Sequence, residues 1–473
     1  MHTPTSHRVS QTVCGFDHIK ANAFVRVLAA FLIFIPASLP FNAEAALNLK
    51  FVNDNTDYGS AYSSDVYVLF TTAPSTTFNA TYDGGTSVQL KHSYTFQEIG
   101  SDGVQISDIT GGVLYVSVGD PMTNDRSSAP SFNNTSDDDY YTRWDQWEIT
   151  YTGQASDDAD LTGINAYALP LRLTTYNGGT GGTQKQDLGY NISGTQMKNE
   201  LGALTSNDPT AVLTDTRQGY NNAFLRVIGP TTFAAGTIGP YQDLQPYVNA
   251  VKSSVSTGTT VAKIVDNYSG PQGGSGRTAS QSYNFQASFN ASGDLVLDGS
   301  GSVVGSHTIT IAAADVAYQI YAADPSYEIS GVGTGNMADN DVYAAAIRDI
   351  LAGFATGFVG STVTDPETGE VIKDEESNKW WVCGLTFDEV QTANVYYNAY
   401  GGVFYQNSNN YGFPFSDRLN ATVQASLDPA NVDTLVLTVA ADAIPEPSSV
   451  ALFAISLFAL AGITRRKLLA KKR

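Results

Sequence analysis

The sequence predicts a mainly β protein, in which a β-sandwich or β-barrel domain packs against an inserted mixed α/β domain, with a cleft between them. The chain is rich in Tyr (26), Phe (22) and Gly (43), and only 15% of its residues are charged. This composition favours short strands and turns over helices. Alternation of apolar and polar side chains dominates the first part of the body, and helical spacing is confined to the middle.

Four segments of the first part alternate with period two and are separated by turn residues, which is typical of half-buried strands. They are residues 64–70, 112–118, 147–151 and 164–173. Strands joined by short turns in this way indicate a sandwich or barrel.

The middle of the chain reads differently. Helices are predicted at 196–203, 240–253 and 339–354, the last with apolar residues at helical spacing. Residues 282–296 are predicted to form a hairpin that turns near Asn290. Aromatic runs after residue 380 predict strands again. The body therefore divides into a first β part at 46–187, an inserted α/β domain at 188–360, and a return to the β domain at 361–443.

Both ends of the chain carry targeting signals. Residues 27–35 are apolar, follow two basic residues, and precede Ala43-Glu44-Ala45, an A-x-A cleavage site. Residues 1–45 are therefore predicted to be a signal peptide. Residues 444–473 begin with a Pro-flanked break, continue with an apolar run from Val450 to Ile463, and end in a basic cluster. This order predicts a short transmembrane helix with the body outside the cell.

The tail closely resembles the PEP-CTERM sorting signal in its motif, its helix and its basic end. The resemblance implies an exported protein of a Gram-negative-type bacterium that makes exopolysaccharide. It further implies an inner-membrane intermediate that is processed by an exosortase and ends at the cell surface or in the extracellular matrix.

Charge and residue counts exclude several functions. The net charge is −21, although nine of the 25 basic residues and only three of the 46 acidic residues lie outside residues 46–443. So acidic a body repels phosphate backbones, and we expect no nucleic-acid partner. Three of the five histidines lie before residue 45, which leaves too few for a zinc cluster or a serine hydrolase triad. We expect no metal and no cofactor.

Two smaller features have simple interpretations. Cys14 belongs to the predicted signal peptide, so no disulfide can form within the mature chain, and Cys383 is expected to be a small buried residue. The acidic runs at 137–139 and 157–160 lack the spacing of a calcium loop. They are predicted to be solvated loops.

The body resembles the β-1,3-glucanases of glycoside hydrolase family 64, which have a thaumatin-like fold. The segments that carry the resemblance share the order of the family between residues 47 and 439: 111–119, 147–151, 164–171, 224–230, 239–248, 339–354 and 411–417. The resemblance implies a wide cleft for long β-1,3-glucan chains. It also implies inverting hydrolysis by one glutamate and one aspartate.

Glu148 matches the glutamate of the family and is the expected general acid. On a strand Glu148, Thr150 and Thr152 share one face, whereas Trp147 and its alternate neighbours share the other. A polar stripe of this kind fits the wall of a substrate cleft. It equally fits a strand face exposed to water.

The aspartate of the family falls on Asn165. If 147–151 and 164–171 form a hairpin around the loop at 156–158, Glu148 lies nearly opposite Asn165. An amide cannot accept a proton from water, so three interpretations stay open. Another acid, Asp160, Asp158 or Asp145, acts as the base; Asn165 only orients a water and hydrolysis is slow; or the protein binds glucan without cutting it.

Aromatic side chains near this site are candidates for stacking on sugar rings. Tyr167 shares a strand face with Asn165, and Trp147 neighbours Glu148; Trp144, Trp380 and Trp381 are further candidates. A single aromatic residue in a β protein is more often part of the core. The predicted substrate-binding residues are Thr150, Thr152, Tyr167 and Trp147. The function expected first is hydrolysis of β-1,3-glucan at the cell surface, and the alternative is a glucan-binding or matrix protein that lost its base.

Overall fold

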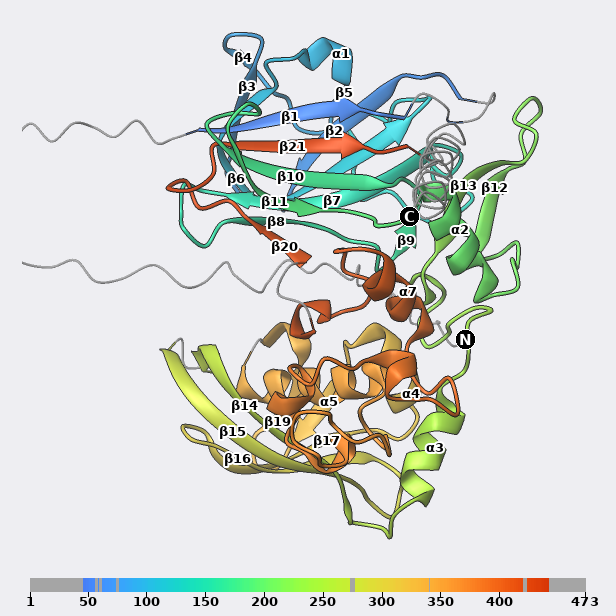
Figure 1. The fold of residues 1–473 in the computed structure, drawn as a ribbon, viewed down its shortest axis with the longest axis vertical. Coiled ribbons are helices and arrows are strands. Elements are labelled where there is room, and N and C mark those ends of the chain that lie inside the picture. Colours follow the sequence, from blue (N-terminus) through green and yellow to red (C-terminus); the bar gives the residue numbers. More distant parts are fainter. Residues whose placement is uncertain are drawn as a thin grey trace, which may run out of the picture.

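The computed structural model describes residues 46–441 except 56–57, 59–61, 74–75, 273–276, 340 and 420–422. The predicted signal peptide and sorting tail lie outside the described residues. Strands make up 35% and helices 20%, which confirms the predicted mainly β fold. Figure 1 shows a large curved sheet in its upper half and a second sheet with helices in its lower half.

The larger sheet is a nearly closed barrel. Its main path runs through β11 (Thr183–Leu188), β10 (Leu171–Asn177), β21 (Thr434–Val439), β1 (Leu47–Asn53), β6 (Val104–Val118), β7 (Arg143–Tyr151), β8 (Asp158–Leu161) and β20 (Gln424–Ser426). Four strands branch from this path: β2 (Val66–Thr72), β3 (Phe78–Tyr82), β4 (Thr86–Ser87) and β5 (Ser93–Thr95), which leads into α1 (Phe96–Ile99).

A side-chain amide bridges the two ends of this path. Gln186 of β11 accepts a hydrogen bond from the Ser426 N–H at 2.7 Å and donates one to the Gln424 carbonyl at 3.3 Å. Edge strands expose unpaired backbone groups. The amide of Gln186 therefore satisfies backbone groups of β20 where a backbone ladder is absent.

The barrel interior holds the first hydrophobic core. One side of each strand supplies it, and on β7 and β8 these side chains are Trp147, Ile149, Tyr151, Ala159 and Leu161. The late strand β21 lies between β1 and β10, parallel to β1 and antiparallel to β10. The two ends of the described chain thus meet in one sheet, as the predicted return to the β domain requires.

A small sheet covers the outer face of β6 and β7. It consists of β12 (Val212–Asp215), β13 (Ala223–Ile228) and β9 (Ala166–Tyr167). Trp144 and Tyr115, from the outer face of the barrel, pack with Leu225 of β13. Near this sheet lie α2 (Gly194–Ala203), η1 (Pro230–Thr232) and α7 (Ala399–Asn407).

The second unit is an antiparallel six-stranded sheet with helices packed on it. Its strands are β14 (Thr260–Gln272), β15 (Arg277–Phe289), β16 (Leu295–Gly301), β17 (Gly305–Ile311), β18 (Ser326–Ile329) and β19 (Gly333–Asn336). Its helices are α3 (Gln245–Ser253), α4 (Val316–Ala322), η2 (Met337–Asp339) and α5 (Val342–Thr356). The helices predicted at 196–203, 240–253 and 339–354 correspond to α2 beside the small sheet and to α3 and α5 here. The predicted hairpin near Asn290 is formed by β15 and β16.

The strands predicted after residue 380 are wrong up to β20. Short helices occupy the chain from residue 372 to η5 instead: η3 (Ile372–Asp374), α6 (Ser377–Trp380), η4 (Phe387–Glu389), α7 and η5 (Ser416–Arg418). Its aromatic residues Trp380, Phe387 and Phe413 are buried in the core of the second unit. Burial on all sides, and not β alternation, accounts for the aromatic runs. The chain returns to the barrel only at β20.

Candidate active site

Two carboxylate residues face each other on neighbouring strands of the barrel. In the register of β7 and β8, Glu148 pairs with Asp160, and Thr150 pairs with Asp158. The alternate pair, Trp147 with Leu161, points into the barrel core. Because side chains alternate along a strand, Glu148 and Asp160 share the opposite face, where both are partly exposed.

The expected hairpin between 147–151 and 164–171 is therefore wrong. β7 pairs with β8, a short strand within the acidic segment that was predicted to be a loop. Alternation was already visible there, since Ala159 and Leu161 point inward between the acids. Asn165 lies beyond the end of β8. Its backbone carbonyl accepts hydrogen bonds from the Gly229 N–H at 2.7 Å and the Thr232 hydroxyl at 2.6 Å.

The three acids considered as a base occupy different positions. Asp160 lies directly opposite Glu148, and Asp158 lies two residues away on the same face. Asp145 is three residues from Glu148 and belongs to the other face of β7. Its buried carboxylate accepts the N–H groups of Ala168 at 2.8 Å and Leu169 at 3.0 Å. Burial raises the pKa of Asp145 to about 6. Asp145 thus holds the connection between β9 and β10.

Tyr411 extends the edge of β8 next to these acids. Its N–H donates to the Leu161 carbonyl at 2.9 Å, and its carbonyl accepts the Gly163 N–H at 2.8 Å. Burial, followed by the charges of Asp417, Asp160, Asp158 and Glu148, raises the pKa of the Tyr411 phenol far above its ordinary value. The phenol is therefore neutral and adds no charge to this group of acids. The sequence marked residues 411–417 as part of the resemblance but assigned Tyr411 no role.

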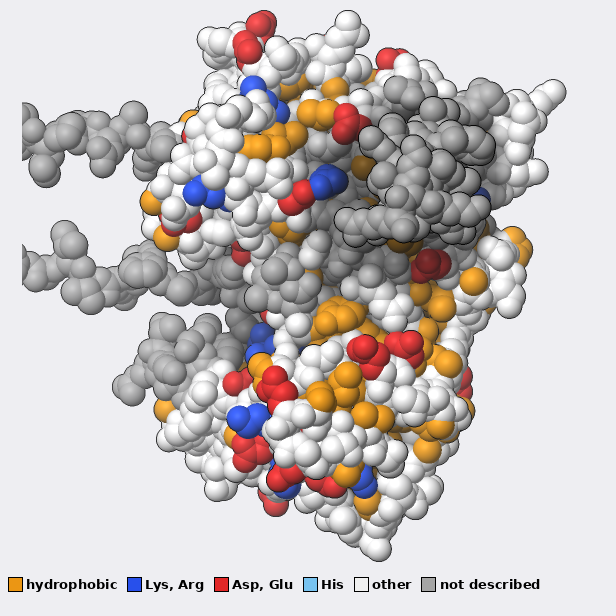
Figure 2. Space-filling view, in the orientation of Figure 1, with side chains coloured by type: hydrophobic (Ala, Val, Ile, Leu, Met, Phe, Trp, Pro, Cys, Tyr) orange, Lys and Arg blue, Asp and Glu red, His pale blue; other side chains and the backbone are white. Residues whose placement is uncertain are grey.

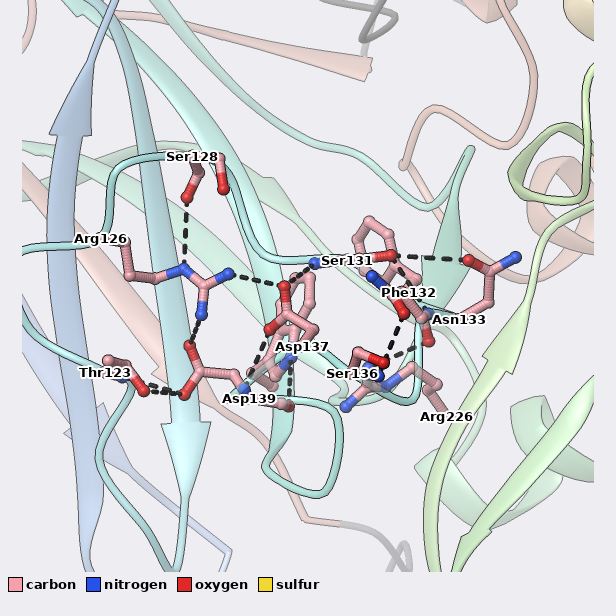
Figure 3. A network of polar contacts seen from close by, with 12 residues as sticks. Thr123, Arg126, Ser128, Ser131, Phe132, Asn133, Ser136, Asp137, Asp139 and Arg226 are labelled. Atoms are coloured by element: carbon pink, nitrogen blue, oxygen red, sulfur yellow. Dashed lines mark hydrogen bonds and ion pairs between the residues drawn. The ribbon is translucent and has the colours of Figure 1, made fainter. Parts of the chain in front are cut away.

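The loop between β6 and β7 is built around buried ion pairs, as Figure 3 shows. Arg126 pairs with Asp137 at 2.7 Å and with Asp139 at 2.5 Å, and Asp139 is only 1% exposed. The prediction of a solvated loop at 137–139 is wrong, because these acids neutralise Arg126. Nearby, the fully buried Arg226 donates to the carbonyl of Phe132 at 3.2 Å.

This loop also supports the surroundings of Asn165. The side-chain amide of Asn133 donates to the Thr232 carbonyl at 2.6 Å. Thr232 in turn donates its hydroxyl to the Asn165 carbonyl. The backbone of Asn165 is thus fixed from two sides. Asn165, where the resemblance leads us to expect the aspartate of the family, thus presents an amide on a well-supported segment.

The residues expected to stack on sugars are mostly buried. Trp147, Tyr167 and Trp144 are 0% exposed, and Trp380 is 1% exposed. The Tyr167 hydroxyl donates to the Gly194 carbonyl at 3.1 Å. Because no ring face of Trp147 or Tyr167 reaches the surface, their expected role in sugar stacking is corrected to a role in the core.

The two threonines lie beside the acids but have local hydrogen bonds. The Thr150 hydroxyl accepts the Gly111 N–H at 3.2 Å. The Thr152 N–H and hydroxyl donate to Asp157 at 2.6 and 3.0 Å. Asp157 is 4% exposed, so it fixes the turn between β7 and β8 and is not a solvated loop acid. Thr150 pairs with Asp158 in the β7–β8 register, next to the Glu148–Asp160 pair, whereas Thr152 lies beyond the end of β7.

Other chemical features are modest. Within the described ranges, no three His, Cys, Asp or Glu side chains are grouped to hold a metal ion. Cys383 is buried as expected, and burial raises the pKa of its thiol.

No helix in the described part of the chain is long and apolar enough to cross a membrane. On the face in Figure 2, basic side chains are scattered and do not gather into a patch.

Known proteins that are similar to this chain are β-1,3-glucanases. The β-1,3-glucanase model of glycoside hydrolase family 64 matches residues 53–439. A crystal structure of a β-1,3-glucanase domain from Clostridium beijerinckii has a TM-score of 0.50 and 14% identity, covering 84% of this chain and 98% of that chain.

Two further crystal structures are similar. One is a laminaripentaose-producing β-1,3-glucanase in complex with laminaritetraose, with a TM-score of 0.49, 14% identity, and coverage of 84% of this chain and 99% of that one. The other is the corresponding enzyme from Paenibacillus barengoltzii with laminarihexaose, with a TM-score of 0.44, 14% identity, and coverage of 84% and 76%. No curated protein matches the sequence significantly.

Proposed function

This chain belongs to the β-1,3-glucanases of glycoside hydrolase family 64, and from that premise we propose that it hydrolyses β-1,3-glucan at the outer face of β7 and β8. The observation that carries the proposal is the register that sets Glu148 directly opposite Asp160. Like charges directly opposite each other destabilise a sheet. The presence of such an unfavourable pair on a partly exposed strand face supports a chemical role for the two acids.

In the proposed reaction, Glu148 is the general acid that protonates the glycosidic oxygen. Asp160 is the general base that takes a proton from the attacking water. Inverting hydrolysis places two such carboxyl groups roughly 6.5–9.5 Å apart, with the water between base and sugar. The two side chains differ in length and start from directly opposed residues of adjacent strands. The Asn165 amide orients substrate or water and does not accept the proton.

A second candidate function is glucan binding without cleavage. The observation that favours it is Asn165, an amide where the resemblance expects the catalytic aspartate, on a segment held by Gly229 and Thr232. In this case Glu148 and Asp160 serve as hydrogen-bond acceptors for sugar hydroxyls.

Export and surface sorting belong to the same proposal. They rest on the sequence of residues 1–45 and 444–473, including the apolar run from Val450 to Ile463. In this proposal an exosortase processes the tail, and the protein meets glucan at the cell surface or in the extracellular matrix.

The test is release of reducing ends from laminarin by the purified protein and by its Glu148→Gln variant. Hydrolysis that is lost in the variant supports the enzyme, since the amide cannot donate the proton as the acid does. Retardation of an inactive wild-type protein by laminarin in an affinity gel supports the binding protein. Neither release nor retardation rejects both.

A further inference from the structure

The loop that carries Tyr411 ends on a buried arginine in the second unit. Arg418, the last residue of η5, lies 3.0 Å from Asp349 of α5 and 3.3 Å from Asp266 of β14. Asp349 is 0% exposed, and its second oxygen accepts the Tyr283 hydroxyl at 2.6 Å. Arg418 stabilises the position of its loop, because moving the arginine away would leave the buried charge of Asp349 uncompensated.

The other end of the loop is bound to the barrel. Tyr411 makes two backbone hydrogen bonds with the end of β8, to Leu161 and from Gly163. The acids that raise the pKa of its phenol include both Asp160 and Glu148. Residues 411–418 therefore connect the carboxylate pair of the barrel with the buried acid of the second unit.

The middle of the loop has little freedom. Phe413 and Phe415 are 1% and 9% exposed in the core of the second unit, and the Ser416 hydroxyl donates to the Phe413 carbonyl at 2.7 Å. Phe415 has a φ of 73°, in the left-handed region that side chains other than glycine rarely adopt. The guanidinium of Arg348 lies 5.3 Å from the centre of the Phe415 ring. Such a backbone persists only where its surroundings hold it in place.

We propose that Arg418 is a positioning residue for hydrolysis, which holds Tyr411 against Glu148 and Asp160 by anchoring residues 411–418 to Asp349 and Asp266. This inference rests on the proposed function. Arg418 touches none of the reacting groups and acts through the loop. The neutral Tyr411 phenol lies in the electrostatic field of these carboxylates and adds no further negative charge to it.

The decisive variant is Arg418→Lys, which keeps the positive charge but loses the planar fork that spans two acids. We expect kcat on laminarin to fall by about tenfold to a hundredfold, because a shift of about 1 Å in a positioned group has effects of this size. We expect KM to change by less than about threefold, since the ion pairs of Arg418 are with Asp349 and Asp266 of the second unit and not with residues of the proposed site. Arg172→Lys, at the exposed ion pair with Asp187 on β10 and β11, makes the same change away from the loop and should leave kcat unchanged.

Hydrogen exchange supplies a readout that does not depend on activity. In Arg418→Lys the amides of Gly163 and Tyr411 should exchange faster, whereas those of β1 and β21 should keep their wild-type rates. An unchanged kcat, or a lower kcat with unchanged exchange at Gly163 and Tyr411, overturns the proposal. If wild-type protein releases no reducing ends, the proposed function fails. In that case the exchange rates of the Gly163 and Tyr411 amides alone test whether Arg418 holds the loop. Unchanged rates in Arg418→Lys would refute the proposed anchoring.

Discussion

Glu148 and Asp160 are directly opposed residues on antiparallel strands, β7 and β8, and both project from the face of the barrel that lies away from its core. Directly opposed residues have Cα atoms only about 4.5–5.5 Å apart. Their carboxyl groups therefore start close together and are separated by side-chain length and rotamer. This geometry gives a concrete pair on which the proposed chemistry can be tested.

Asp160→Asn should lower the laminarin turnover by about a hundredfold or more, because general-base catalysis contributes about 10²–10⁴-fold. Asp158→Asn is the matched control on the same strand face, opposite Thr150, and should lose less than about tenfold. Initial rates of reducing-end release measure both. Equal losses in the two variants would contradict Asp160 as the specific base.

Asn165→Asp tests whether a carboxylate at residue 165, the position that the resemblance suggested for the base, contributes to hydrolysis. If Asp160 is the base, the new carboxylate should change turnover by less than about threefold, since a second base adds little to a working one. A gain of about tenfold or more would instead show that the original site geometry survives at residue 165. Thermal unfolding of the variant serves as the control, because Asn165 is held by its backbone carbonyl and the substitution keeps that bond.

Trp147→Leu should destabilise the barrel without a specific effect on sugar binding. Trp147 is 0% exposed in the first core, and truncating a buried aromatic residue costs about 3–5 kcal/mol at most. Denaturant unfolding measures this loss, and laminarin affinity gels of the folded variant measure binding. Unchanged stability with weakened laminarin binding would restore the rejected stacking role.

Gln186→Ala should destabilise the protein by about 1–2 kcal/mol, because two backbone groups of β20 lose their partner. Gln184→Ala is the control, since Gln184 is an exposed glutamine of the same strand and does not bridge to β20. The free energy of unfolding of each variant gives the comparison. If the two variants are equally stable, the amide bridge contributes nothing to barrel closure.

The buried Asp349 predicts a pH dependence of stability. Burial raises its pKa to about 6, above the unfolded value of about 3.9. Its stabilising contribution is therefore fully present below about pH 4 and is lost as the pH rises through about 6. Asp349→Asn cannot ionise, so between pH 4 and 7 the wild type should lose about 3 kcal/mol relative to this variant.

Denaturant unfolding at several pH values measures that difference. Arg418, Asp266, Arg348 and Tyr283 surround Asp349 and are present in both proteins, so their own titration largely cancels. Asp102→Asn, at an exposed acid before β6, should follow the wild-type curve. A difference between wild type and Asp349→Asn that is flat across this range would contradict the raised pKa.

The sequence by itself determined the mainly β class, the helices α2, α3 and α5, and the polar face of β7. Each of these follows from local periodicity, as with Glu148 and Thr150 opposite to Trp147, or with the helical spacing of residues 339–354. The burial of Cys383 followed from its chemistry alone. Resemblance pointed to the family to which the chain belongs.

Only the tertiary structure decided which residues meet. The family resemblance and an assumed hairpin placed Asn165 nearly opposite Glu148, where the register places Asp160. Periodicity specifies a strand face but not the partner strand. It could not distinguish an aromatic residue in the core, such as Tyr167, from one at a binding surface. The link from Tyr411 to Arg418 and Asp349 joins segments far apart in the chain. Such contacts depend on how the two hydrophobic cores pack together, which local sequence patterns do not specify.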